Sequence, residues 1–251
     1  MNKIKADDGY FFGIGVFETI AIEQGRLIFL EEHMKRLRKG MEALHIPHPR
    51  GREKLSTEHL LETVRRGGME KGALKIAVSQ ENVTLSFREN PYTKEQYEKG
   101  FLLDLASTVR NETSPFTYLK SLNCGENILE KRAARRRGMD EPVFINTKGQ
   151  LAEGATTNLF FGKNGRLYTP PLSCGLLDGI VRKFVMQKFP VEEKVVYPCE
   201  AGEYDEMMVT NSLLGIMPVN RFEDIAFSSR TLCSMLTEEY EKCSQNSRFL
   251  L

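Results

Sequence analysis

The sequence lacks an excess of charge of either sign, and it lacks any long apolar run. Among its 251 residues, 35 Lys and Arg face 34 Asp and Glu, so the net charge of +1 gives no long-range attraction to nucleic acid or anionic membranes. No apolar stretch approaches the roughly 20 residues that span a bilayer, and the start MNKIKADDGY has no apolar segment typical of a signal peptide. We therefore expect a cytoplasmic protein that binds a small-molecule substrate, with no nucleic-acid or membrane partner.

Paired cysteines and clustered histidines are also lacking. The five cysteines are odd in number and scattered, with no CxxC pair, which predicts reduced thiols. All four histidines fall in the first quarter of the chain, and none has the spacing of zinc ligands. We predict no metal site, and we expect all four imidazoles to be exposed or half-buried.

The length allows one large domain or two unequal ones. Apolar residues at helical spacing predict a helix over 30–44, and a second helix begins at Thr57 and ends at Gly67 and Gly68. The segments ALKIAVS and VTLSF are typical of strands. These elements predict a small N-terminal α/β domain over residues 1–106.

A polar stretch interrupted by Pro115 follows, and we interpret residues 107–117 as an interdomain linker. Beyond it, a predicted helix over about 125–137 precedes short strands at PVFIN, TTNLFF and RLYTP. A further helix begins near Gly179, the strand EMMVTN follows, and a last helix carries Leu232 and Leu236. Residues 118–251 therefore read as a larger, strand-rich domain with helices around it.

Lys120 is the first residue with a candidate chemical role. It lies in the apolar-flanked segment FTYLKSLN, and partly apolar surroundings favour the neutral amine that a Schiff base requires. The same position also suits an ordinary lysine at the solvated edge of a strand, and the segment by itself does not separate these two interpretations.

Two further features are compatible with an anionic, aromatic cofactor. Glu153, in LAEGATTN, could meet a buried cation such as a pyridinium nitrogen, although an ordinary turn glutamate has the same pattern. The segment LLDGIVRKFV runs from a glycine turn into a helix near Ile180, and a helix N-terminus offers free amides to a phosphate. Arg36 could supply a second contact to that phosphate, or could equally be a surface residue of its helix.

Seven motifs, in a fixed order along the chain, assign these features to one kind of enzyme. From Phe12 to about Val219 the chain resembles the class IV pyridoxal-phosphate enzymes. The motifs are GxGVFET, EHxxRL, LKSLN, EGxxxN, YTPPL, GLLDGIVR and VTNSLLGIMPV. The resemblance implies a fold-type IV enzyme, of mixed α/β (α+β) class, with a small N-terminal α/β domain, a larger C-terminal pseudo-barrel domain, pyridoxal 5'-phosphate between them, and a homodimer.

The resemblance also implies roles for individual residues. Lys120 would be the Schiff-base lysine and Glu153 the partner of the pyridine nitrogen. The phosphate would be held by Arg36, by the backbone amides of Ile180 and Val181, and by Ser212. The family commonly has threonine where this chain has Val181, so one hydroxyl contact worth about 1 kcal/mol is absent.

Within this family the chain most resembles the lyases that convert 4-amino-4-deoxychorismate to 4-aminobenzoate and pyruvate, a step of the folate pathway. Lys75, in ALKIAVS, resembles a lyase lysine that can meet a substrate carboxylate, although a solvent-facing strand lysine is the alternative. Thr19 falls where lyases carry a threonine that faces the cofactor and can assist proton transfer. A strand threonine without a function fits the same pattern.

Related transaminases have other residues at these places. D-amino acid aminotransferases carry a tyrosine at the position of Phe17, and branched-chain aminotransferases have a GTA-type loop where this chain reads Asn211-Ser212-Leu213. Leu213 would crowd the carboxylate site that such a loop builds. We therefore expect a lyase, with Leu213 at the substrate site. The alternatives are a class IV aminotransferase for D- or branched-chain amino acids, and a catalytically idle pyridoxal-phosphate binder.

Overall fold

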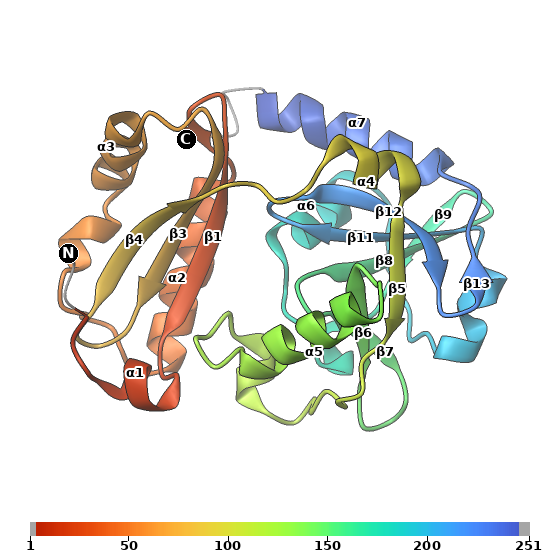
Figure 1. The fold of residues 1–251 in the computed structure, drawn as a ribbon, viewed down its shortest axis with the longest axis horizontal. Helices are drawn as coiled ribbons and strands as arrows, with labels where there is room; N and C mark the ends of the chain where they lie inside the picture. Colours follow the sequence, from red (N-terminus) through yellow and green to blue (C-terminus); the bar gives the residue numbers. More distant parts are fainter. Residues whose placement is uncertain (1–3, 246–251) are drawn as a thin grey trace. The chain divides into compact units, whose positions relative to one another are not determined.

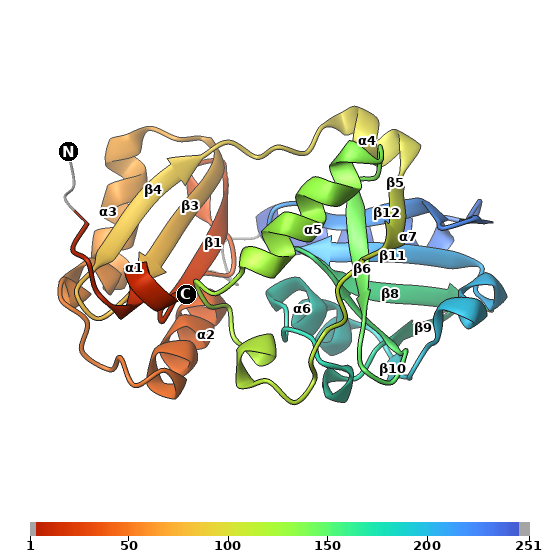
Figure 2. The ribbon, with the colours of Figure 1, turned by 60° about the horizontal axis from the view of Figure 1, so that its bottom comes forward.

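The computed structural model describes residues 4–245, which form two compact units (Figures 1 and 2). Of the described residues, the first unit comprises 4–91, Leu119–Cys124 and 243–245. The second comprises Tyr92–Tyr118 and Gly125–Lys242. The chain thus leaves the first unit and returns to it for a few residues around Lys120.

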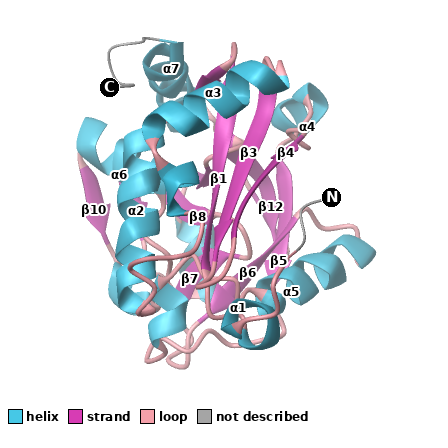
Figure 3. Ribbon diagram, turned by 90° about the vertical axis from the view of Figure 1, so that its left-hand side faces the viewer, coloured by secondary structure: helices cyan, strands magenta, loops and turns pink. Residues whose placement is uncertain are grey.

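The first unit is built on a four-stranded antiparallel sheet in the order β2-β1-β3-β4, of which Figure 3 labels β1, β3 and β4. Its strands are β1 (Val16–Glu23), β2 (Arg26–Leu27), β3 (Lys71–Val78) and β4 (Val83–Arg88). The hairpin between β1 and β2 turns at Gln24 and Gly25, both with positive φ, as a two-residue turn between twisted strands requires.

Helices cover one face of this sheet because the alternate strand residues on that face are mostly apolar and pack against them. The helices of the unit are α1 (Asp8–Phe12), α2 (Leu30–Ala43) and α3 (Thr57–Gly67), with a 3₁₀ turn η1 (Arg52–Leu55). Ser56 caps α3 by accepting from the His59 amide, and Gly68 ends it in the left-handed conformation. The helices predicted from the spacing of apolar residues are therefore confirmed.

The second unit contains a nine-stranded sheet in the order β10-β9-β8-β11-β12-β5-β6-β7, with β13 paired to β12. Its strands are β5 (Phe101–Leu105), β6 (Glu141–Ile145), β7 (Leu151–Gly154), β8 (Asn158–Lys163), β9 (Arg166–Thr169), β10 (Val191–Glu193), β11 (Glu206–Asn211), β12 (Gly215–Phe222) and β13 (Ile225–Ala226). Because β7 also pairs with β8, six of these strands close into a ring around an apolar core. The predicted fold, an α/β unit with a pseudo-barrel, is confirmed.

The helices of the second unit are α4 (Lys94–Lys99), α5 (Gly125–Arg136), α6 (Ile180–Lys188) and α7 (Thr231–Gln245), with 3₁₀ turns η2 (Pro115–Tyr118), η3 (Leu172–Cys174) and η4 (Pro198–Glu203). The last residues of α7, from Cys243, group with the first unit. Between residues 4 and 245 no helix is long and apolar enough to cross a membrane.

The two units divide at other positions than the linker suggested by the sequence. Strand β5 hydrogen-bonds to β12 and β6, both in the second unit, so the chain already enters that unit at Tyr92. Residues 107–117 belong to the second unit as well, where Arg110 bridges to Asn146. The polar, proline-containing composition of these residues indicated an interdomain linker. Their backbone contacts with strands of the second unit place them in that unit instead.

Candidate active site

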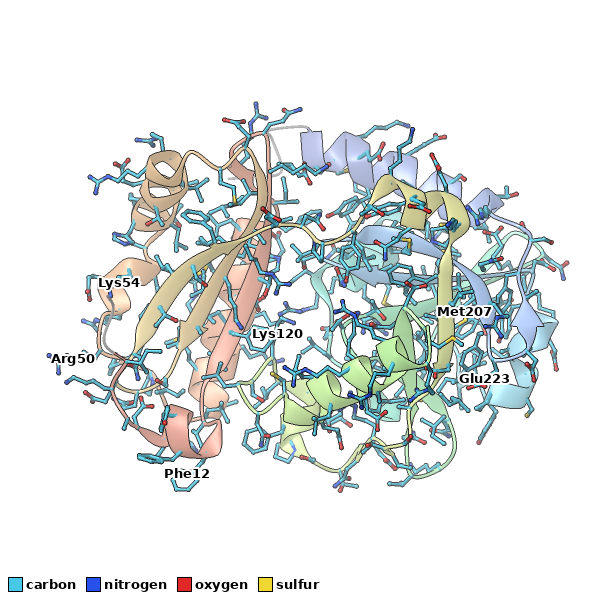
Figure 4. All side chains as sticks on the ribbon, in the orientation of Figure 1. Phe12, Arg50, Lys54, Lys120, Met207 and Glu223 are labelled. Atoms are coloured by element: carbon cyan, nitrogen blue, oxygen red, sulfur yellow. The ribbon has the colours of Figure 1, made fainter. Side chains whose placement is uncertain are left out.

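Lys120 lies beside β1 in the first unit, where Figure 4 labels it. The Phe17 amide donates to the Lys120 carbonyl at 2.9 Å, and Val16 bridges to Ser121. Gly15 makes this approach possible, because a Cβ there would lie 2.6 Å from both Leu122 Cδ1 and the Val78 carbonyl oxygen. The LKSLN segment is therefore a short extension of the sheet, and Lys120 is half-buried at its edge.

The ring of Phe17 is shared by two lysines. Lys120 Nζ lies 4.7 Å from the ring centroid and Lys75 Nζ lies 5.0 Å from it. Lys75 is paired in register with Thr19 on β1, so Phe17, Thr19 and Lys75 share the sheet face opposite the helices. The structure thus brings together Lys120, Lys75 and Thr19, three of the four first-unit residues that we predicted to act on cofactor and substrate.

The helix-covered face of the same sheet carries a buried ionic cluster. Arg36 donates from Nε and Nη2 to the two oxygens of Glu18, each at 2.7 Å, and His33 Nδ1 lies 2.6 Å from Glu18 Oε2. Glu18 and His33 are 0% and 1% exposed. The prediction that every imidazole would be exposed or half-buried is wrong for His33, because α2 turns this residue toward the carboxylate on β1.

Burial and charge act in opposite directions on Glu18. Burial raises the pKa of its carboxyl, but the charge and hydrogen bonds of Arg36, with those of His33, outweigh it and lower that pKa to about 2. Burial lowers the pKa of His33 against the opposing effect of the Glu18 charge, and the His33 Nδ1–H donates to the Glu18 carboxylate. Glu18 thus accepts two of the five N–H donors of the Arg36 guanidinium.

Glu153 is buried on β7 in the second unit. Its Oε2 accepts the Leu177 amide at 3.0 Å, and its Oε1 lies 3.4 Å from Arg110 Nη2. Leu177 belongs to the loop that leads into α6, so one hydrogen bond joins the carboxylate to the start of that helix. A buried carboxylate in this setting suits a cationic or N–H-bearing ligand.

The N-terminus of α6 has no side-chain cap. Gly179 is its N-cap and provides no side-chain hydrogen bond, so the first amides, those of Ile180 and Val181, lack an intrahelical acceptor. Asn158 approaches so closely that a Cβ on Gly179 would lie 2.0 Å from its Oδ1, while its Nδ2 donates to the Leu177 carbonyl at 2.8 Å. These amides and the positive end of the helix dipole fit a phosphate group.

The turn between β11 and β12 holds the remaining predicted residues, Ser212 and Leu213, both half-buried. Asn211 organises this turn: its Oδ1 accepts the amides of Leu213 and Leu214 at 2.8 and 2.9 Å. Its Nδ2 donates to Tyr92 Oη and to the Thr156 carbonyl. Two backbone amides of the turn therefore already have an acceptor.

The predicted residues form one group in each unit. Lys120, Thr19, Lys75 and Arg36 lie in the first unit, and Glu153, Ile180, Val181, Ser212 and Leu213 lie in the second. Four residues around them had not been assigned a role: Glu18, His33, Arg110 and Asn158. The sequence offered one signal for Glu18, namely a carboxylate among the apolar residues on one face of β1. It offered none for Arg110, whose polar surroundings had suggested a linker.

Comparison with known proteins agrees with this architecture. A family model for class IV aminotransferases matches residues 15–222. An aminodeoxychorismate lyase of Bacillus subtilis is 25% identical over 90% of this chain and 83% of its own length. A D-alanine aminotransferase of Bacillus licheniformis is 28% identical over 96% and 90%. The crystal structure of the 4-amino-4-deoxychorismate lyase of Pseudomonas aeruginosa superposes with a TM-score of 0.83 at 24% identity, covering 96% of each chain.

Proposed function

Because the chain belongs to the class IV aminotransferase family, whose members depend on pyridoxal 5'-phosphate, we propose that it is a lyase that converts 4-amino-4-deoxychorismate to 4-aminobenzoate and pyruvate. The proposal is supported most directly by the turn at Asn211, since its Leu213 and Leu214 amides are already bound to Asn211 Oδ1. A transaminase needs donors for a carboxylate on the reacting carbon. The lyase substrate has no carboxylate there.

The residues present fit the cofactor. Lys120 offers a half-buried amine, Glu153 a buried carboxylate for the ring nitrogen, and the start of α6 offers amides for the phosphate. We propose Arg36 and Ser212 as additional phosphate contacts. When bound, the cofactor supplies an aldehyde for the substrate amine and a ring that accepts electron density from the adjacent carbon.

The chain's own residues would then move two protons. Lys120 Nζ removes the proton from the ring carbon that bears the substrate amine, and Glu153 keeps the pyridine nitrogen protonated. Lys120, or Thr19 through its hydroxyl, delivers a proton to the methylene carbon of the enolpyruvyl group. The bond between the ether oxygen of the enolpyruvyl group and its ring carbon then breaks, pyruvate leaves, and the ring becomes aromatic. The protein therefore mainly orients the substrate and moves protons.

Lys75 is the proposed contact to a substrate carboxylate, and Leu213 the proposed apolar wall. Lys75 lies on the same sheet face as Thr19 and beside the ring of Phe17, so a cation stands near the residues that move protons. Its half-buried position makes an ion pair with a carboxylate stronger than on an open surface.

The test is to supply 4-amino-4-deoxychorismate to the purified holoenzyme and to measure 4-aminobenzoate and pyruvate together. Equal amounts of both products, absent in Lys120→Ala, are expected. The alternative activity, supported by the similarity to D-alanine aminotransferase, is tested with D-alanine or L-leucine plus 2-oxoglutarate. Transamination without 4-aminobenzoate formation would overturn the lyase proposal, and neither activity in cofactor-loaded protein would support an idle binder.

Two other expectations remain proposals, a homodimer and a cytoplasmic location. Sedimentation at micromolar concentration tests the dimer, and an active monomer would contradict it. Cell fractionation tests the location.

A further inference from the structure

Arg110 is a buried cation for which the proposed reaction has no direct use. It is 6% exposed and its backbone amide donates to the Ile145 carbonyl at 2.8 Å, which holds the residue against β6. Its guanidinium carbon lies 3.8 Å from the centroid of the Phe144 ring. The first contact fixes the backbone of Arg110, and the second stacks its guanidinium against an aromatic ring.

Two carboxylates flank this guanidinium. Nη1 donates to Glu126 Oε2 at 3.0 Å, and Nη2 lies 3.4 Å from Glu153 Oε1. The second distance is longer than the roughly 2.7–2.9 Å of a charge-assisted hydrogen bond, so this contact is an ion pair. The other oxygen of Glu153 accepts the Leu177 amide, and the carboxylate is thus held from two directions.

The two carboxylates beside Arg110 differ in their exposure to water. Glu126 is 44% exposed, so water screens much of its charge, whereas Glu153 is 9% exposed and is not screened in this way. A buried N–H beside Glu153 would therefore meet a carboxylate that Arg110 and the Leu177 amide contact from two sides.

We propose that Arg110 is the positioning residue for Glu153: it holds the carboxylate, through the 3.4 Å ion pair, in the ionised state and the orientation that binds the pyridine nitrogen of the cofactor. The inference rests on the proposed role of Glu153 at that nitrogen. Arg110 acts through Glu153 and does not touch the reacting atoms.

The test compares two ligands of the apoenzyme, pyridoxal 5'-phosphate and its 1-deaza analogue, in which C–H replaces the ring nitrogen. The ratio of their dissociation constants measures the contact at the nitrogen alone. A loss of general structure weakens both ligands and leaves the ratio unchanged, so the ratio separates positioning from folding.

We expect Arg110→Met to lower the preference for pyridoxal 5'-phosphate at least tenfold, and Arg110→Lys to retain most of it. Arg110→Gln replaces the methionine variant if that protein does not fold. The matched control is Arg137→Met, since Arg137 pairs with Asp104 in the same unit and should leave the ratio at the wild-type value.

Glu153→Gln distinguishes the two levels of the proposal. If it leaves the ratio unchanged, Glu153 does not bind the ring nitrogen, and the site assignment fails with the inference. If Glu153→Gln abolishes the preference but a folded, neutral Arg110 variant stays within twofold of wild type, only the role of Arg110 is overturned.

Discussion

The guanidinium of Arg36 donates two hydrogen bonds of 2.7 Å to the carboxylate of Glu18, a residue with no exposed surface. This pair joins α2 to the sheet that bears Phe17 and Lys75 on its other face. It therefore connects the stability of the first unit to the residue that we propose as a phosphate contact.

Glu18→Gln should destabilise the protein by about 2–4 kcal/mol, because it leaves the charge of Arg36 without its buried partner. Urea unfolding of the apoprotein measures this loss. Glu31→Gln is the matched control: Glu31 pairs with Lys35 on the same helix, but both side chains are more than half exposed, so no measurable change is expected. Equal effects of the two substitutions would contradict a special role for the buried pair.

Acid should remove the stability that the ionised Glu18 carboxylate contributes to the folded protein. The pKa of Glu18 is about 2 in the folded protein against an ordinary value of 4.5, so below pH 4.5 the unfolded chain takes up a proton that the folded cluster does not. The contribution, about 3 kcal/mol, is complete above pH 4.5 and is lost as the pH falls toward 2. Burial lowers the pKa of His33 from 6.5, which acts with the same sign and begins at higher pH. Glu18→Gln should show a shallower acid slope than wild type, and parallel slopes would show that other groups cause the loss.

Gly179→Ala should weaken both folding and cofactor binding. Its new Cβ would lie 2.0 Å from Asn158 Oδ1, so Asn158 must move and release the Leu177 carbonyl. We expect a loss of about 1–3 kcal/mol in unfolding free energy and weaker binding of pyridoxal 5'-phosphate in fluorescence titration. Gly125→Ala, at the start of α5, is the control because nothing lies within 4 Å of its Cβ position. If Gly179→Ala binds the cofactor with unchanged affinity, the loop before α6 does not contribute to the phosphate site.

Borohydride reduction of the holoenzyme should leave the pyridoxyl group on Lys120. Lys75 is the informative competitor, because its ammonium lies about as far from the Phe17 ring as that of Lys120. Peptide mapping by mass spectrometry identifies the modified residue. A pyridoxyl group on Lys75 would exchange the roles that we propose for the two lysines.

Lys75→Met should impair turnover of the substrate rather than binding of the cofactor. Deleting the charge while retaining the aliphatic stem should lower kcat/KM for 4-amino-4-deoxychorismate by about 1.5–3 kcal/mol in transition-state stabilisation, with the cofactor spectrum unchanged. Lys71→Met, at the exposed start of the same strand, is the control. If Lys75→Met turns over substrate at the wild-type rate, Lys75 is a solvated strand residue and the lyase proposal loses its substrate contact.

The sequence by itself determined the local elements and the family. Apolar spacing located α2 and α3, alternation located β3 and β4, and seven ordered motifs indicated the family before any packing was known. These features depend on neighbours within a few residues, so a pattern along the chain is sufficient to reveal them.

Only the tertiary structure decided which residues meet. Whether Arg36 reaches a carboxylate depends on strand β1 bringing Glu18 under α2, and neither residue shows this locally. Arg110 and Glu153 are separated by more than 40 positions, and their ion pair exists because β6 and β7 pair beside the loop that carries Arg110. The boundary of the units has the same origin, since β5 joins the barrel through hydrogen bonds to strands that follow it in the chain. Such contacts are set by long-range backbone pairing, which composition and periodicity do not encode at any single position.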